Sequence, residues 1–169
     1  QTLAQDPESW CVSAEWRATI SKSMDSSAPT WLHYLHLGVM DLENEALDAA
    51  EEHLSKCVTL RENMHAYRNL AIVFRLKGTW DLAEANYLKA WRLSECMELA
   101  IEIAQFYQAR DDLEAAQDFI AALPDLLRCH ERIQLVAAAL ALEIGDGQKV
   151  REILFEQEFV TIREGETIL

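Results

Sequence analysis

Residues 67–90 of the chain read YRNLAIVFRLKGTWDLAEANYLKA, and this stretch decides the fold. Its first half places residues at the i, i+3, i+4, i+7 spacing of one helix face: Tyr67, Leu70, Ala71 and Phe74. Its second half has a similar helical spacing: Ala83, Tyr87 and Ala90. Gly78 stands between them and can adopt the left-handed conformation that ends one helix before the next begins. The stretch therefore predicts a helix hairpin.

The same features recur along the chain at a regular interval. Small residues of the first helix recur in two equal steps: Gly38, Ala71 and Ala104. Three positions of the second helix recur with the same first step and a second step that is shorter by one: Ala50, Ala83 and Ala115; Leu54, Tyr87 and Phe119; Cys57, Ala90 and Ala122. We expect the small residues to let the first helix approach the second. Because one hairpin cannot bury both of its apolar faces alone, this period predicts stacked hairpins.

The units resemble the tetratricopeptide repeat, whose pattern is W-x2-L-G-x2-Y, then A-x3-F, then P. The first two units read Tyr34-x2-Leu37-Gly38-x2-Asp41 with Ala50-x3-Leu54, and Tyr67-x2-Leu70-Ala71-x2-Phe74 with Ala83-x3-Tyr87. The next two read Ala100-x2-Ile103-Ala104-x2-Tyr107 with Ala115-x3-Phe119, and Gln134-x2-Ala137-Ala138-x2-Ala141 with Val150-x3-Leu154. The resemblance implies an all-α, right-handed superhelix of antiparallel hairpins, with a concave groove lined by the first helices.

The spacing divides the chain into four hairpins and two flanking segments. We expect hairpins at residues 30–62, 63–95, 96–127 and 128–155. Residues 1–29 are expected to form a capping helix and a linker, with Asp6 and Pro7 at the helix start and an apolar stripe of Val12, Trp16 and Ile20. Residues 156–169 are expected to form a C-terminal extension, in which Phe159, Val160 and Ile162 could cover the last hairpin as a short extended piece.

Composition narrows the classes of function. The chain has 169 residues, half of them apolar, with only five Gly and three Pro, which favours a folded helical protein over a disordered one. Its 15 Lys and Arg against 29 Asp and Glu give a formal net charge of -14. A field of this sign repels phosphate backbones and anionic lipids, so neither nucleic acid nor a membrane is expected as a partner.

The cysteines indicate the cellular compartment, and the first residue indicates whether the chain is part of a longer protein. Cys11, Cys57, Cys96 and Cys129 are too widely spaced for a C-x-x-C motif, so free thiols in a reducing compartment are expected, and we expect the cytoplasm. The chain starts at Gln1 without a Met, which suggests that a longer protein contains it.

The groove face of the first helices contains the candidate binding residues. In the second unit this face has a local positive charge, and its members are His65, Arg68, Asn69, Ile72 and Arg75. Arginine can pair with a carboxylate through two parallel hydrogen bonds, so one interpretation is an anchor for an acidic peptide. The competing interpretation is that Arg68 and Arg75 pair with acidic residues of adjacent hairpins, Glu102 for example.

The corresponding faces of the other units are apolar or uncharged. In the first unit the face is a hydrophobic patch of Leu32, Leu35, Val39 and Leu42, either covered by the N-terminal helix or available to a partner. In the fourth it is Leu135, Ala139 and Leu142, for which we favour cover by the C-terminal segment. In the third it is a polar wall: Glu98, Ile101, Gln105 and Gln108.

No motif in the sequence indicates catalysis, a metal or a cofactor. His33 and His36 are three residues apart on one helix, but no further ligand completes a metal site by spacing, so we interpret them as packing residues. Glu51, Glu52 and His53 are interpreted as a solvated turn of helix. We therefore expect a non-enzyme.

We expect a module for protein-protein interaction or for docking within a larger chain, with the inner groove as the site. Its partner would be a protein, a peptide or another domain of the same parent chain. Apolar end hairpins also favour homo-oligomers. An alternative comes from residues 159–166 and Leu123-Pro124, which resemble the closing helical region of large bacterial proteins with a mutarotase-like β-sandwich. That resemblance implies the C-terminal appendage of a carbohydrate-acting protein, with catalysis in residues outside this chain.

Overall fold

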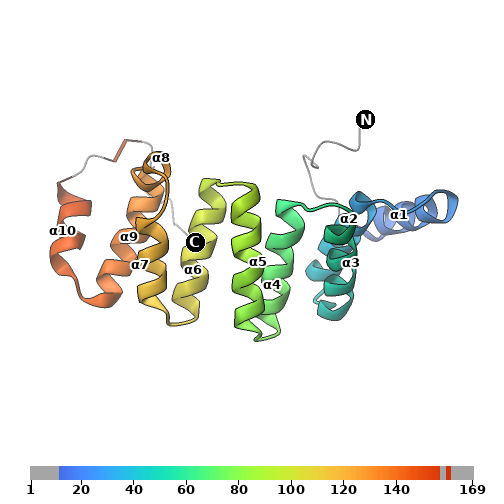
Figure 1. Ribbon diagram of the computed structural model, residues 1–169, viewed down its shortest axis with the longest axis horizontal. Helices are drawn as coiled ribbons and strands as arrows, with labels where there is room; N and C mark the ends of the chain where they lie inside the picture. The colour runs from blue at the N-terminus through green and yellow to red at the C-terminus, as the bar shows by residue number, and fades with distance from the viewer. Residues whose placement is uncertain (1–11, 157–158, 161–169) are drawn as a thin grey trace. The chain divides into compact units, whose positions relative to one another are not determined.

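The computed structural model describes residues 12–156 and 159–160, and it is all-helical over these residues, with no strand (Figure 1). The helices of the first half are α1 (Ala14–Ser26), α2 (Trp31–Glu43), α3 (Leu47–Leu60), α4 (Met64–Leu76) and α5 (Trp80–Leu93). Those of the second half are α6 (Met97–Ala109), α7 (Leu113–Ala121), α8 (Asp125–Arg128), α9 (Glu131–Ile144) and α10 (Gly147–Phe155). The fold class predicted from the repeats, all-α with tetratricopeptide-like hairpins, is confirmed.

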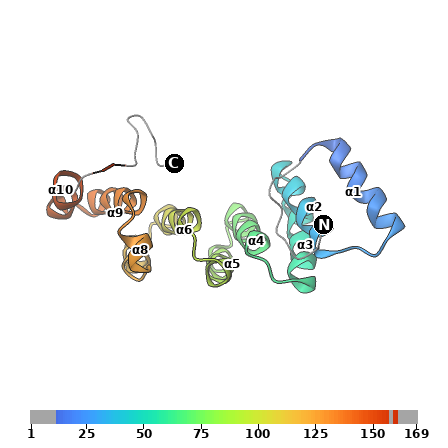
Figure 2. The ribbon, with the colours of Figure 1, turned by 90° about the horizontal axis from the view of Figure 1, so that it is seen from above.

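The helices form two compact units, Gln1–Ser94 and Glu95–Leu169. In the first unit α2 pairs with α3 and α4 with α5, and α3 packs on α4, so two hairpins stack. In the second unit α6 pairs with α7 and α9 with α10, and α9 packs on both α6 and α7. Figure 2 shows α4 and α5 of the first unit, and α6 of the second, nearly end on. Stacking gives each hairpin a second apolar contact, as a repeat architecture requires.

The four hairpin turns share one backbone motif. Each contains a single residue with positive φ: Glu45 (58°), Gly78 (74°), Asp111 (63°) and Gly145 (84°). In each turn the N–H of the next residue donates to a carbonyl five residues earlier: Ala46 to Asp41 (2.8 Å), Thr79 to Phe74 (2.9 Å), Asp112 to Tyr107 (2.9 Å) and Asp146 to Ala141 (2.8 Å). This is the Schellman arrangement that satisfies the last carbonyls of a helix. This arrangement fixes the reversal of the chain in each of the four hairpins.

The small residues of the first helices lie where the two helices of a hairpin meet. Ala71 and Ala104 are fully buried, as are the second-helix residues Ala50 and Ala83. Gly38 is buried against α3, close to Leu54. The expectation that small side chains permit close helix approach therefore agrees with the packing.

The alignment of the repeat pattern predicted for the third hairpin, residues 96–127, is wrong by one residue in its second helix. Ala116 and Ile120 are buried in α7 and Leu123 follows as a buried residue, whereas Ala115 and Phe119 are only half-buried. The step from Ala83 to Ala116 thus equals the step from Ala50 to Ala83, and the repeat is not shortened by one. The physical reason is the turn: Asp111 takes the left-handed position that Gly78 has one repeat earlier, and it fixes where α7 begins.

The segments that flank the hairpins differ in part from expectation. The described part of the N-terminal segment contains α1, whose N-cap Ser13 accepts a hydrogen bond from the N–H of Trp16 (3.4 Å). In the expected stripe only Ile20 is buried: Val12 precedes α1, and Trp16, one turn before Ile20 on the same face, is 49% exposed. Asp6 and Pro7 lie outside the described residues.

The second unit contains two features beyond the hairpins. After Pro124 the chain forms the single turn α8 before α9 begins. At the end of the described chain, the N–H of Val160 donates to Glu131 Oε1 (2.7 Å) at the start of α9, while Val160 remains exposed. Ile162, the third residue of the expected extended piece, lies outside the described residues.

Candidate functional site

Helix α4, the first helix of the second hairpin, carries the basic face predicted for that hairpin. Asn63 caps the helix by accepting a hydrogen bond from the N–H of Ala66 (3.1 Å), and the buried face of α4 then packs on α3 and α5. The predicted site residues His65, Arg68, Ile72 and Arg75 are all half-buried. Asn69 is buried, with 6% of its surface exposed, and its Oδ1 accepts a hydrogen bond from Arg68 Nη1 (3.3 Å). The face is therefore a row of partly covered side chains, with two guanidinium groups along it.

Arg75 has a donor without an acceptor. Its Nε is a buried nitrogen that finds no hydrogen-bond partner among the described residues. Arginine stays protonated in proteins, and a buried donor without an acceptor costs about 1–3 kcal/mol.

The predicted site residues of α6 belong to the second unit. Gln105 and Gln108 are half-buried, and Gln108 Nε2 donates to Glu143 Oε2 of α9 (3.3 Å). The two first helices of this unit, α6 and α9, are thus joined by a polar contact on the predicted face. Glu98 is exposed and Ile101 is half-buried, so the polar face of α6 is only partly open to solvent.

The apolar patch predicted on α2 is divided by the fold. Leu35 belongs to the core and is fully buried, so it is not available to a partner. Leu32, Val39 and Leu42 are half-buried. The N-terminal helix covers a different part of α2, because Ile20 and Met24 pack against Leu37 and Met40. The sequence could not separate these faces, since α2 is apolar around most of its circumference.

The corresponding residues of α9 are more open than we expected. Leu142 is 69% exposed and Ala139 is exposed, while Leu135 is half-buried. The described C-terminal residues Phe159 and Val160 do not bury Leu142, so the expected cover of this face is not seen in the described part of the chain.

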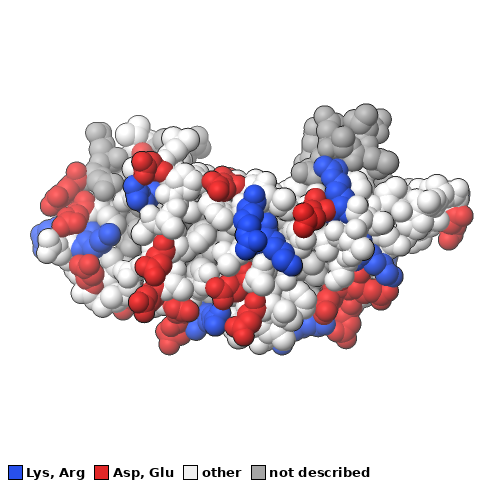
Figure 3. Space-filling model, viewed as in Figure 1, with Lys and Arg blue, Asp and Glu red and all other residues white. Residues whose placement is uncertain are grey.

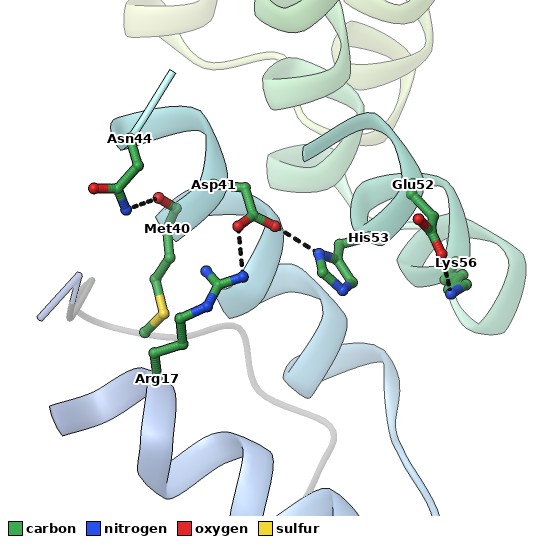
Figure 4. Close-up of polar contacts among 7 residues, drawn as sticks. All are labelled: Arg17, Met40, Asp41, Asn44, Glu52, His53 and Lys56. Atoms are coloured by element: carbon green, nitrogen blue, oxygen red, sulfur yellow. Dashed lines mark hydrogen bonds and ion pairs between the residues drawn. The ribbon is translucent and has the colours of Figure 1, made fainter. Parts of the chain in front are cut away.

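A polar cluster around Asp41 was not predicted from the sequence (Figure 4). Asp41 is 3% exposed, and its two carboxylate oxygens are held from two helices. Arg17 Nη2 of α1 lies 2.6 Å from Oδ1, and His53 Nδ1 of α3 lies 2.6 Å from Oδ2. His53 is half-buried and stacks on Tyr34, so our interpretation of it as part of a solvated turn is wrong. The available signal was the pattern itself, because Asp41 occupies the place where the repeat has tyrosine.

His33 and His36 have structural roles in the first unit. His33 Nδ1 accepts from the Thr30 N–H (3.0 Å), and its Nε2 lies 3.1 Å from Ser23 Oγ of α1. Nδ1 of His33 thus helps to cap α2, while its Nε2 contacts α1. His36 is half-buried, and burial together with the nearby His33 charge lowers the pKa of His36. Among the described residues no group of three or more His, Cys, Asp or Glu could hold a metal ion.

Charge is distributed over the hairpins rather than gathered on one helix. Lys77 Nζ, near the end of α4, contacts Asp48 Oδ1 (2.5 Å) and Glu51 Oε2 (2.6 Å) of α3, which raises the pKa of Lys77 and lowers that of Asp48. On the face shown in Figure 3, acidic and basic side chains are intermingled in both units. Through the described part of the chain, no helix is both long enough and apolar enough to span a bilayer.

Comparison with known proteins finds similar solved structures but no match by sequence. No protein-family model and no curated protein matches the sequence. The structure is similar to a chain of the APC/C hetero-tetramer Cut9-Hcn1, with 18% sequence identity and a TM-score of 0.65, over 82% of this chain and 27% of that chain. It is also similar to PilF of Pseudomonas aeruginosa, with 18% identity and a TM-score of 0.61, over 83% of this chain and 68% of that chain.

These similar structures are tetratricopeptide-repeat proteins, so the resemblance seen in the sequence is confirmed at the level of the fold. The chain spans about a quarter of the length of the Cut9-Hcn1 chain. The class defined by the hairpins is therefore a helical repeat fold of the tetratricopeptide type.

Proposed function

We propose that this chain is a non-catalytic docking module that binds a protein segment along the first helices of its hairpins. The site in the first unit is the α4 face, formed by His65, Arg68, Asn69, Ile72 and Arg75. In the second unit, Gln105 and Gln108 of α6 form the corresponding polar face. The partner is a separate protein or another domain of the same parent chain.

The observation that carries the proposal is the unpaired Nε of Arg75. Most buried polar groups in folded proteins have a partner, so an exception on the predicted binding face is informative. Asn69 and Arg68 are held together near the middle of the same helix. Ile72 lies between the two arginines in sequence and offers an apolar surface. A segment with a carboxylate next to an aliphatic side chain fits this combination.

The test is peptide binding measured by fluorescence anisotropy. The probes are labelled peptides rich in Asp, Glu and Leu, and the proteins are the full chain and its Arg68→Glu, Arg75→Glu double variant. We expect the double variant to bind at least about tenfold more weakly, because two attractive charges become repulsive.

The matched control is the double variant Lys22→Glu, Arg92→Glu. Both control residues are exposed and lie on α1 and α5, so the change in net charge is the same but the α4 face is intact. Equal losses in the two double variants would show that only net charge matters. Unchanged binding in the Arg68→Glu, Arg75→Glu variant would show that the α4 face is not the binding site.

We retain the appendage of a larger bacterial carbohydrate-acting protein as the alternative. It is supported by the resemblance noted at residues 159–166, most of which lie beyond the described residues, and by the exposed apolar side chains Leu142 and Phe155 of the last hairpin. The complete upstream reading frame decides it: a long β-rich region before Gln1 supports the appendage, and a start codon directly before Gln1 excludes it.

We also propose a reducing compartment, the cytoplasm. Cys57, Cys96 and Cys129 are free thiols, and of these Cys129 is exposed. An exposed free thiol such as that of Cys129 persists in compartments where glutathione and thioredoxin keep cysteines reduced. Fractionation of the host cell would test this placement.

A further inference from the structure

A pocket of about 490 Å³ lies in the second unit, lined by residues of α7, α8, α9 and α10. Its size falls within the roughly 300–1,000 Å³ typical of small-molecule sites. Helix α9 contacts both α7 and α10, and Figure 1 shows α9 between these two second helices. The α9 residues of the pocket, Gln134, Ala137 and Leu140, are not those of the predicted inner face of that helix. The pocket is therefore separate from the face formed by the first helices.

Part of the pocket lining is apolar. Ile120 of α7 and Leu140 of α9 line the pocket and are buried, with 7% and 1% of their surface exposed. Ala121 and Ala137 also line it, and their small side chains leave room that larger residues would fill. This part of the lining accepts an aliphatic side chain, because contact with its apolar atoms removes that side chain from water.

One end of the pocket is formed by the single turn α8, which lies outside the hairpins. Arg128 of α8 lines the pocket, and its guanidinium group is held by two hydrogen bonds. Its Nη1 donates to the Ala121 carbonyl (3.1 Å) and its Nη2 to Asp125 Oδ1 (2.5 Å). Gln134 Nε2 donates to the Arg128 carbonyl (2.6 Å), which leaves Gln134 Oε1 as an acceptor for a ligand. This end of the pocket is therefore fixed before any ligand binds.

The pocket also contains two groups of opposite charge that do not pair with each other. Asp118 lies on α7 and Lys149 lies near the start of α10, and both are exposed. Among the described residues neither side chain has an ion-pair partner, and the amide of Gln117 in the same lining makes no hydrogen bond. A ligand therefore meets a carboxylate on the α7 side of the pocket and an ammonium group on the α10 side.

We propose that this pocket binds a short zwitterionic peptide with aliphatic side chains, of the size of a dipeptide. Its ammonium group pairs with Asp118 and its carboxylate with Lys149, while an aliphatic side chain packs on Ile120 and Leu140. A simple anion would also meet the Asp118 carboxylate, and a simple cation would meet Lys149 and Arg128. Only a ligand with both charges is complementary to the pocket. This binding is independent of the α4 face, which lies on another helix and in the other unit.

The first experiment titrates the full chain with leucyl-leucine and follows the isotope-labelled side-chain amides of Gln117 and Gln134 by NMR. We expect saturable shifts of both amide signals, because both residues line the pocket. Two analogues each lack one charge: N-acetyl-leucyl-leucine has no ammonium group, and leucyl-leucinamide has no carboxylate. Each analogue should bind at least about tenfold more weakly than leucyl-leucine, because hydrogen bonds to charged groups are stronger than those between neutral groups.

The second experiment assigns each charge of the ligand to its residue. Asp118→Asn should weaken the binding of leucyl-leucine at least about tenfold and leave the binding of the acetylated analogue unchanged, because that analogue has no ammonium group to lose. Lys149→Gln should likewise weaken leucyl-leucine and leave leucyl-leucinamide unchanged. The matched controls are Glu114→Gln on α7 and Arg151→Gln on α10, both exposed and outside the pocket lining, and they should bind as the wild type does.

A third variant fills the pocket without changing its charges. Ala137→Trp should abolish binding, whereas Ala139→Trp, at an exposed position of α9, should not, and circular dichroism checks that both variants keep their helix content. Absence of saturable shifts in the wild type, or equal binding of leucyl-leucine and its two analogues, would overturn the proposal. Full affinity for leucyl-leucine in both Asp118→Asn and Lys149→Gln would overturn the pocket as the site.

Discussion

Gly38 of α2 lies so close to Leu54 of α3 that a Cβ added to Gly38 would stand 2.5 Å from Leu54 Cγ and 2.7 Å from Leu54 Cδ2. Leu54 is fully buried, so its side chain has no free space to move into. The backbone N of Leu54 would also lie 3.3 Å from the new atom. The first hairpin therefore depends on the absence of a side chain at position 38.

The first prediction is that Gly38→Ala destabilises the protein. Overpacking a core costs about 1–3 kcal/mol, which exceeds the gain of up to about 1 kcal/mol that alanine brings to a helix. We expect a net loss of about 1 kcal/mol, measured by urea unfolding. Leu54→Ala in the same chain should relieve the clash, so the double variant should be less destabilised than the sum of the single variants.

A matched control is available in the same fold. Gly147 begins α10, and an added Cβ there meets nothing within 4 Å. Gly147→Ala should leave stability unchanged or raise it by up to about 1 kcal/mol. If Gly38→Ala behaves like Gly147→Ala, the close approach of α2 and α3 is not what the structure indicates.

The second prediction concerns the left-handed turn residues. Glu45 and Asp111 have positive φ with a side chain attached, whereas Gly78 and Gly145 fill the same place without strain. We expect Glu45→Gly to stabilise the protein by about 0.5–1 kcal/mol, and Asp111→Gly by less, because aspartate tolerates this conformation better. Gly78→Ala should destabilise it. Thermal unfolding would check the signs, and a loss of stability in Glu45→Gly would contradict the shared turn geometry.

These turns also show why the sequence predicts the repeat but misplaces part of it. Gly78 marks its turn, because glycine is the residue most often used for this conformation. Glu45 and Asp111 carry no such signal, so sequence spacing aligns the third unit on Ala115 rather than Ala116. A helix that is rich in alanine gives little means of choosing between neighbouring registers. The position of the turn decides the register, and only the structure shows that turn.

The third prediction is a pH dependence that comes from His36. Burial and the nearby His33 lower the pKa of His36 below its ordinary value of 6.5, so the unfolded chain binds the proton more readily. Stability from this group is complete above pH 6.5 and is lost as the pH falls toward the folded-state pKa. His36→Gln should therefore flatten the stability curve between about pH 6.5 and 5.

The carboxylates of Asp48 and Glu52 set the lower end of the pH range in which this measurement is made. The Lys77 contact lowers the pKa of Asp48, and the Lys56 contact lowers that of Glu52, from ordinary values of 3.8 and 4.5. Their contributions are lost only at more acidic pH, so these two carboxylates do not contribute to the slope above pH 5. If the free energy of unfolding changes with pH equally in the wild type and in His36→Gln, the pH dependence comes from a group other than His36.

The fourth prediction concerns thiol reactivity. Burial raises the pKa of Cys57 to about 12, so almost none of this residue is thiolate at pH 8. Cys129 is exposed. Iodoacetamide at pH 8 followed by peptide mapping should modify Cys129 quickly and Cys57 only after denaturant is added. Rapid modification of native Cys57 would show that α3 does not pack as described.

The candidate site is less accessible to sequence reasoning than the fold. The α4 face follows from helical spacing, which is why its half-buried residues can be identified. Spacing assigns Leu35 to a patch although the fold buries it, since spacing does not show which of several apolar faces a neighbour covers. Asp41 escapes notice because its partners, Arg17 and His53, come from other helices, and long-range pairing leaves no local pattern.

The most direct test of the docking account places a photo-cross-linking amino acid on the α4 face of the full chain. p-Benzoylphenylalanine at Ile72 should capture the bound acidic peptide, and the same residue at Ala85, exposed on α5, should not. Capture from position 72 alone would support binding along the first helices. Capture from position 85, with none from position 72, would contradict it.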